Sequence, residues 1–267
     1  MGTPACSVVI CSVDPAKYAR VTATYRRLLA AVDHEIIGIH DARSLAEAYN
    51  RAARQARGEL VVFSHDDVDI ASTDLPGALA RAAERLDIVG IVGTSKLVSA
   101  FWPAAGHPWL HGWMSMPNRD GAGYFVHVYG VDAAVTAGLE AVDGMFFAAR
   151  RAVLAQVAFD AATFDGFHAY DVDFSFAASR AGFRVGTTAE IALIHESPGG
   201  YGAEWARYGE RFAAKHRGVL PAPAPARPWS LARVLVPGKE DIVRGFPLAR
   251  LAAITAQLRA VKLGSEP

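Results

Sequence analysis

Residues 44–69 of the chain read SLAEAYNRAARQARGELVVFSHDDVD, and this stretch decides the fold. Ser44 followed three residues later by Glu47 is a capping box, which predicts that a helix begins here. We expect this helix to end at Gly58, in the left-handed conformation that glycine tolerates. The β-branched and apolar run 60–64 then predicts a buried strand that leads directly into a cluster of acidic residues.

The alternation of helix and strand continues on both sides of this stretch. Apolar runs at 7–11, 35–40 and 88–92 predict three more strands. Asp14 and Asp74, each close to a proline, predict the starts of two more helices. Strands that alternate with helices form parallel sheets through right-handed crossovers. We therefore predict an α/β fold with a mostly parallel central sheet flanked by helices, and ligand binding at the carboxyl ends of its strands.

Residues 99–130 have no clear hydrophobic period and are rich in tryptophan, proline and glycine. We expect long loops there, with a hairpin at 124–129. Regular patterns return with a strand within 142–149 and with helices at 174–181 and 204–216.

Composition divides the chain into a globular domain over residues 1–218 and a C-terminal part over 219–267, which contains a Pro/Ala linker at 221–228 and a helical extension. The extension holds a basic amphipathic helix at 247–263, which has two interpretations. It contacts a membrane surface peripherally, or it packs against its own domain or in a homodimer.

The 267 residues carry no net charge, because 27 Lys and Arg balance 27 Asp and Glu. This balance argues against electrostatic binding of nucleic acid. Two cysteines exclude a disulfide scaffold and a four-cysteine zinc site. The sequence shows no secretory signal and no apolar run long enough to span a membrane, so we expect a cytoplasmic protein. A dinucleotide dehydrogenase is also excluded, because no G-x-G-x-x-G loop follows the first strand.

Three carboxylates lie within four positions at the end of the strand at 60–64, namely Asp66, Asp67 and Asp69. Such carboxylates repel one another unless a divalent cation lies among them. The alternative is a solvated turn, because turns favour aspartate for their own hydrogen bonds. Both interpretations stay open at this point.

Three further motifs carry residues able to do chemistry. Asp171 and Asp173 enter a helix, where each is either a cap or, at the mouth of a pocket, a general base. His195 ends an apolar run in front of a glycine-rich loop, which favours a functional histidine over a structural one. Asp143 and Gly144 form a turn before a strand.

The order of these motifs resembles that of the GT-A glycosyltransferases of family 2, and most closely the glycosyltransferase-like family 2 group, with an HDD sequence at 65–67. The resemblance covers about residues 7–217. It implies a nucleotide-diphospho-sugar transferase (GT-A) fold and an inverting, metal-dependent transfer of a sugar. The donor would be a nucleotide-sugar, most commonly a UDP-sugar, and the acceptor a hydroxyl of a glycan or a lipid-linked molecule. Biosynthesis of a cell-envelope or capsular polysaccharide is the usual setting of such relatives, which implies a cytoplasmic protein that is peripheral at the inner face of the membrane.

The resemblance also implies roles for individual residues. Asp67, with Asp69 and His195, would hold Mn²⁺ or Mg²⁺ against the charge of the leaving diphosphate. Asp171 would be the catalytic base that removes the proton of the acceptor hydroxyl. The residues implied at the nucleotide are Val9, Cys11, Ser12, Asp41, Asn50, Arg54, His65 and Asp66. Those implied at the acceptor or its sugar are Trp113, Asp143, Gly144, Tyr170 and Asp173.

Two departures from the family pattern keep other functions open. His65 stands where the family motif has its first aspartate, and Tyr170 stands where it has a glutamate. One alternative is a GT-A protein that binds a sugar nucleotide or a carbohydrate without catalysis, and the other is a metal-dependent phosphohydrolase or nucleotidyltransferase. Trp102, Trp109 and Trp113 either stack on sugar faces or pack in the core.

Overall fold

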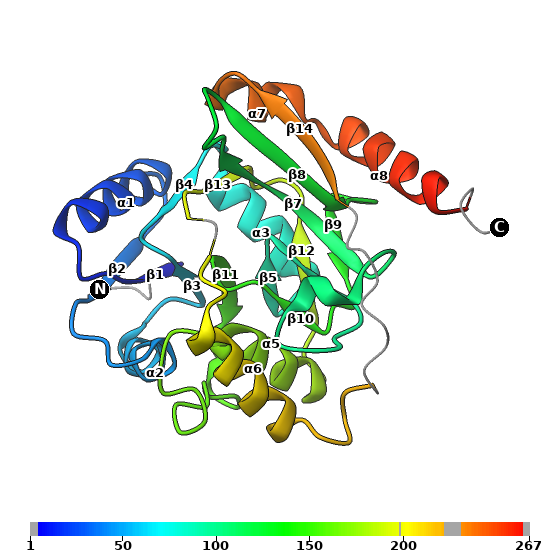
Figure 1. Ribbon diagram of the computed structural model, residues 1–267. Coiled ribbons are helices and arrows are strands. Elements are labelled where there is room, and N and C mark those ends of the chain that lie inside the picture. The colour runs from blue at the N-terminus through cyan, green and yellow to red at the C-terminus, as the bar shows by residue number, and fades with distance from the viewer. Residues whose placement is uncertain (1–4, 198, 222–230, 264–267) are drawn as a thin grey trace.

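Two β-sheets organise the computed structural model of the chain, which describes residues 5–197, 199–221 and 231–263 (Figure 1). The Pro/Ala linker expected at 221–228 lies outside the described residues except for Pro221. The side chains of 261–263 are likewise outside the description.

The first sheet confirms the mostly parallel α/β architecture. Strand β1 pairs in parallel with β2 and β3, and β5 pairs in parallel with β12. An antiparallel strand, β11, inserts between β3 and β5, and β9 is antiparallel to β12. The strand order is β2 (His34–Ile39), β1 (Cys6–Cys11), β3 (Leu60–Ser64), β11 (Phe146–Arg150), β5 (Ile88–Gly90), β12 (Val185–Thr188) and β9 (Val135–Ala137).

Three helices of the first half begin where their capping residues predict. They are α1 (Pro15–Leu28), α2 (Leu45–Gln55) and α3 (Leu75–Arg85). The side chains of Asp14, Ser44 and Asp74 each accept a hydrogen bond from a backbone N–H of the first turn. The prediction for Gly58 is wrong, because α2 ends at Gln55 and Gly58 is not left-handed. A Cβ on Gly58 would lie 2.5 Å from the Ser7 nitrogen, so this glycine permits a close approach to β1.

The second sheet lies beside the first, and its strand β6 is separated from β5 by one residue, Ile91, so the apolar run 88–92 is divided between the two sheets. The hairpin expected at 124–129 is wrong in its bounds, because these residues form the single strand β8, which pairs in antiparallel with β7. The expected long loops are wrong for 110–117, which form β7. The inner residues of β7 are buried on both faces, so the strand has no alternating pattern. The order is β10 (Ala141–Val142), β6 (Val92–Thr94), β7 (Leu110–Pro117), β13 (Leu193–His195) and β4 (Val68–Ile70); β8 (Tyr124–Gly130) pairs with β7, and β14 (Ala232–Val236) pairs with β8.

The remaining α-helices follow in the second half of the chain. A 3₁₀ helix at Trp102–Ala105 precedes β7. Helix α5 starts four residues earlier than predicted, and α6 matches its prediction. The bounds are α4 (Arg151–Leu154), α5 (Tyr170–Arg180), α6 (Ala203–Lys215), α7 (Lys239–Gly245) and α8 (Leu248–Leu263).

The C-terminal part does more than form a helical extension. Strand β14 adds to the second sheet, and α7 and α8 follow it along the same side of the molecule (Figure 1). Leu251 of α8 and Phe246 are buried in an apolar cluster with Val126 and Val128 of β8. The helix predicted at 247–263 therefore packs against its own domain, which was one of its two interpretations. Among the described residues, no helix combines the length and the apolar character needed to cross a membrane.

Candidate active site

The carboxyl ends of β1 and β3 border a cavity of about 320 Å³, at the edge of the sheet where ligand binding was predicted. Its wall includes Cys11, Ser12, His65 and Asp66, which were all predicted at the nucleotide. The Ser12 hydroxyl donates a hydrogen bond of 2.6 Å to Asp66 Oδ2 and thereby joins the two strand ends. We call this cavity the candidate nucleotide pocket.

The other residues predicted at the nucleotide do not line this pocket. Val9 is fully buried within β1. Asp41 is exposed and forms an ion pair with an arginine of α2. Asn50 binds both backbone groups of Phe159, at 2.7 and 3.0 Å, and so fixes a neighbouring loop. Arg54 is exposed on α2. Placement on an element beside the pocket did not determine where these side chains point.

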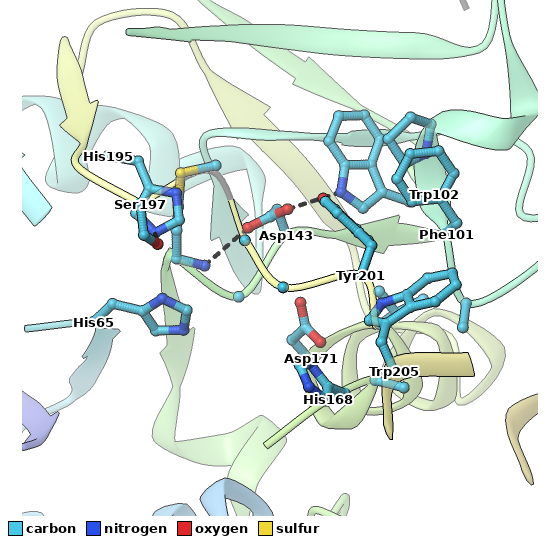
Figure 2. Close-up of a pocket in the computed structure, with 18 of the residues that line it drawn as sticks. His65, Phe101, Trp102, Asp143, His168, Asp171, His195, Ser197, Tyr201 and Trp205 are labelled. Carbon is cyan, nitrogen blue, oxygen red and sulfur yellow. Dashed lines mark hydrogen bonds between the residues drawn. The ribbon is translucent and has the colours of Figure 1, made fainter. Parts of the chain in front are cut away.

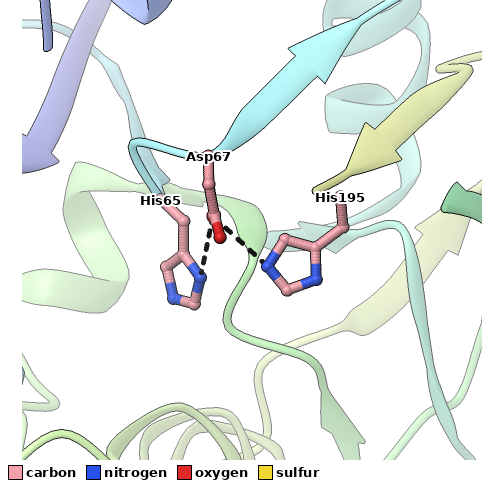
Figure 3. A group of neighbouring side chains, drawn as sticks. All are labelled: His65, Asp67 and His195. Carbon is pink, nitrogen blue, oxygen red and sulfur yellow. Dashed lines mark ion pairs between the residues drawn. The ribbon is translucent and has the colours of Figure 1, made fainter. Parts of the chain in front are cut away.

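His65, Asp67 and His195 form a group that fits a divalent cation (Figure 3). One potential ligand atom from each lies within 4.8 Å of the others. Asp67 Oδ1 lies 3.3 Å from His195 Nε2 and 3.9 Å from His65 Nδ1. The antiparallel pairing of β13 with β4 brings the group together, because His195 lies opposite Val68.

The state of these side chains also suits a metal. Asp67 Oδ1 is buried and has no hydrogen-bond partner among the described residues. Burial raises the pKa of the Asp67 carboxyl, but the interactions with His195 and His65 outweigh it and hold the pKa below its ordinary value. Burial and the neighbouring His195 lower the pKa of His65, which favours the neutral, ligating imidazole. Two imidazoles beside one carboxylate suit a transition-metal dication better than Mg²⁺, which prefers oxygen ligands.

Asp69 does not join this group, contrary to its prediction as a metal ligand. Its Oδ2 accepts a hydrogen bond of 2.6 Å from Lys239 Nζ, so its charge is neutralised by α7 instead. His65, predicted at the nucleotide, is the third member. It borders both the nucleotide pocket and the cavity described next.

The two departures from the family pattern are in contact with each other. The Tyr170 hydroxyl lies 2.9 Å from His65 Nε2, while His65 Nδ1 faces Asp67. Tyr170 is buried, and its ring packs edge-on against Tyr49 at 5.5 Å. Tyr170, predicted at the acceptor, lines the cavity described next, and its hydroxyl also fixes the orientation of a potential metal ligand.

A second cavity, of about 360 Å³, adjoins the metal group, and Asp171 extends into it from the first turn of α5 (Figure 2). We call it the candidate acceptor cavity. Ala169, just before α5, has a left-handed backbone with φ of 62°, which is uncommon for a residue with a side chain. A Cβ on Gly144 would lie 2.7 Å from the Asp171 Cβ, so the turn at 143–144 requires glycine in order to approach Asp171.

Burial raises the pKa of Asp171 to about 7, and the negative charge of Asp143 adds to this rise. A carboxyl that titrates near neutral pH is suited to accept a proton during a reaction. Asp143 is fixed by two hydrogen bonds. Its Oδ2 accepts from Trp102 Nε1 at 2.8 Å, and its Oδ1 accepts from the Met145 N–H at 2.9 Å (Figure 2).

Asp173 does not lie at the cavity, because residues two apart on a helix point to different sides. It is almost fully buried between α5 and α6. Its Oδ2 accepts a hydrogen bond of 2.7 Å from Lys215 Nζ, and its Oδ1 lies 2.8 Å from His216 Nε2. Its role is to join the two helices.

The three tryptophans have different environments. Trp113, predicted at the acceptor, is buried in the apolar cluster of the second sheet and donates a hydrogen bond of 3.0 Å to the Ala189 carbonyl. Trp109 packs against the main core. Of these three, only Trp102 borders the acceptor cavity, through the indole that donates a hydrogen bond to Asp143.

Several residues at the acceptor cavity were not identified from the sequence. Phe101, His168, Tyr201 and Trp205 line it, and Ser197 lies 3.3 Å from His195 Nε2. The glycine-rich loop after His195 was a signal for Tyr201. No sequence signal separated Trp205 from the buried aromatic residues of its amphipathic helix.

Residues 7–215 match the model of a protein family described as a glycosyltransferase-like family. No curated protein matches the chain. The solved mannosyltransferase PcManGT from Pyrobaculum calidifontis, in complex with GDP-Man and Mn²⁺, is 13% identical over 100% of this chain and 77% of that chain, with a TM-score of 0.50. TarS 1–349 from S. aureus is 15% identical over 80% of this chain and 72% of that chain, with a TM-score of 0.43.

At these identities, the likeness to solved structures concerns the fold alone. It agrees with the predicted GT-A architecture, and the family match covers most of the chain, including every member of the metal group and the acidic residue Asp171. The chain belongs to this glycosyltransferase-like family.

Proposed function

We propose that the protein is an inverting, metal-dependent glycosyltransferase that moves a sugar from a nucleotide-sugar donor to a hydroxyl acceptor. The observation that carries the proposal is that Asp171, with a pKa of about 7, faces a cavity whose wall also contains His65 and His195 of the metal group. The candidate base and two members of the metal group border the same cavity, which supports the proposal.

The donor is assigned to the two cavities as follows. Its nucleoside occupies the candidate nucleotide pocket beside Ser12 and Asp66. Its diphosphate lies at His65, Asp67 and His195, where a bound Mn²⁺ would neutralise the charge that develops on the leaving group. Its sugar faces the acceptor cavity. Among the described residues that line the two cavities there is no Lys or Arg, so the charge of the diphosphate depends on the cation.

The reaction is a single displacement at the anomeric carbon. The acceptor hydroxyl oxygen bonds to that carbon as the bond from the carbon to the phosphate oxygen breaks. The proton of the hydroxyl passes to Asp171, and the nucleoside diphosphate leaves. One in-line displacement inverts the anomeric configuration. A UDP-sugar as the donor and a glycan or lipid-linked acceptor in polysaccharide biosynthesis remain our first choices, on the family resemblance.

A thermal-shift screen of nucleoside diphosphates and nucleotide-sugars, each with Mn²⁺, Mg²⁺ or EDTA, tests the donor. A ligand at a hundred times its Kd stabilises the fold by about 2.7 kcal/mol. We expect one nucleoside family to raise Tm with Mn²⁺ and not with EDTA. Stabilisation by none of them would contradict the proposal and favour the binder or the phosphohydrolase.

A further inference from the structure

Phe101, Tyr201 and Trp205 form an aromatic cluster on one side of the acceptor cavity (Figure 2). Phe101 precedes the 3₁₀ helix, Tyr201 lies in the loop after β13, and Trp205 is in the first turns of α6. The ring centroids of Phe101 and Tyr201 are 5.5 Å apart, those of Phe101 and Trp205 5.9 Å, and those of Tyr201 and Trp205 5.4 Å. Two segments that are a hundred positions apart in the chain therefore meet here.

This aromatic cluster is not part of the packed core. Tyr201 is 62% exposed, and Phe101 and Trp205 are only partly buried. None of the three belongs to the two apolar clusters of the core, whereas Trp109, which is also partly buried, packs against one of them. Leaving aromatic surface exposed in a concave site gives up the free energy of burying it. Such surface is typical of a site that a ligand covers.

The rest of the cavity determines which chemistry such a ligand has. The carboxylates of Asp143 and Asp171 and the imidazole of His168 face the same space as the aromatic cluster. Carboxylates accept hydrogen bonds from hydroxyls. They also repel anions, and no Lys or Arg among the described lining residues compensates them. A purely apolar group would leave these carboxylates desolvated without partners.

A neutral sugar ring satisfies both sides of the cavity. Its C–H faces pack against aromatic rings, and its hydroxyls lie around its edge, where carboxylates bind them. We propose that Phe101, Tyr201 and Trp205 are the acceptor subsite, and that the acceptor presents a neutral, hydroxyl-rich sugar ring, not an acidic sugar, a phosphorylated sugar or an alkyl alcohol. This assignment rests on the proposed function and specifies its acceptor.

Binding of free sugars tests the subsite without turnover. The probes are neutral methyl glycosides of glucose, galactose, mannose and N-acetylglucosamine, with glucuronic acid, glucose 6-phosphate and octanol as the contrasting compounds. Saturation-transfer NMR and calorimetry on the full chain, with Mn²⁺ and a nucleoside diphosphate present, give contacts and Kd. We expect at least one neutral glycoside to bind, and the acidic, phosphorylated and alkyl probes to bind at least tenfold more weakly.

Variants identify the residues. Trp205→Ala and Tyr201→Ala should each raise the Kd of that glycoside about tenfold, whereas Tyr201→Phe, which keeps the ring, should restore binding. Trp109→Ala is the matched control, because it removes a partly buried tryptophan outside the cavity. The melting temperatures of the variants, compared with that of this control, show whether a loss of binding follows from unfolding.

The outcomes separate this proposal from the proposed function. Unchanged glycoside binding in Trp205→Ala would overturn the subsite, and preferred binding of glucuronic acid, glucose 6-phosphate or octanol would overturn the acceptor class. Both results would stand even if nucleotides bind with Mn²⁺ as proposed. Conversely, if no nucleotide binds but the glycoside binds through Trp205, the transferase proposal fails and the sugar subsite is supported.

Discussion

The protonation of Asp171 links the fold to the proposed chemistry at the scale of one residue. Its carboxyl must be ionised to accept a proton, and its pKa is raised to about 7. We therefore expect kcat/KM to rise about tenfold per pH unit below pH 7 and to level off above it. The measurement is transfer at saturating Mn²⁺, with metal occupancy checked at each pH.

Asp171→Asn should abolish transfer and keep nucleotide binding; a fully active variant would remove Asp171 from the base role.

The same shift predicts a change in stability. The folded protein binds the Asp171 proton more tightly than the unfolded chain, whose carboxyl has the ordinary pKa of 3.8. Asp171 therefore contributes to the free energy of unfolding of the wild type fully below pH 3.8. This contribution is lost as the pH rises to about 7. Asp171→Asn should raise Tm by a few degrees at pH 8 and by less at pH 4.5. Equal shifts at both pH values would show that burial does not raise this pKa.

Tyr170 gives a third prediction at this scale. Its hydroxyl is the partner of His65 Nε2, and groups that orient a metal ligand typically contribute 10- to 100-fold to affinity. Tyr170→Phe should weaken Mn²⁺ binding about tenfold, measured by electron paramagnetic resonance of free Mn²⁺. Tyr25→Phe is the control, because the Tyr25 hydroxyl is buried without a hydrogen-bond partner among the described residues. If Tyr170→Phe binds Mn²⁺ as tightly as Tyr25→Phe does, a positioning role for Tyr170 is excluded.

At the scale of elements, the contact of α5 with α6 holds Asp171 beside the aromatic cluster. Buried Asp173 accepts a hydrogen bond from Lys215 Nζ, which also pairs with Asp160 at 2.8 Å. Lys215→Met leaves buried Asp173 with His216 alone, so we expect a loss of about 3 kcal/mol, measured by urea unfolding. The double variant Asp173→Leu with Lys215→Met should recover part of it. A single variant as stable as the wild type would show that this pair does not hold the helices together.

At the scale of the whole molecule, the C-terminal part covers the second sheet. Leu251 of α8 is 1% exposed, whereas Leu248, one turn earlier, is 42% exposed. Leu251→Ala should therefore lower the free energy of unfolding by about 2–5 kcal/mol. Leu248→Ala should change it by less than about 0.5 kcal/mol. If Leu248→Ala is neutral for stability but reduces co-sedimentation with anionic vesicles, the peripheral membrane contact expected for this helix is supported; unchanged co-sedimentation would argue against it.

The sequence by itself determined the strand and helix alternation of the first half, because local caps and apolar runs act over a few residues. Ser44, Asp14 and Asp74 mark helix starts through bonds to their own first turns. The order of the motifs also predicted the GT-A fold and drew attention to Asp67, Asp171 and His195. Those signals do not depend on which distant segments meet.

Only the tertiary structure decided how distant residues share the site. The pairing of β13 with β4 places His195 at Asp67, whereas Lys239 from α7 withdraws Asp69 from the metal group. The contact of His65 with Tyr170 and the meeting of Phe101 with Trp205 are equally long-range. Periodicity shows which side of an element is buried, but it does not show which distant element faces it, and the chemistry of this site depends on that pairing.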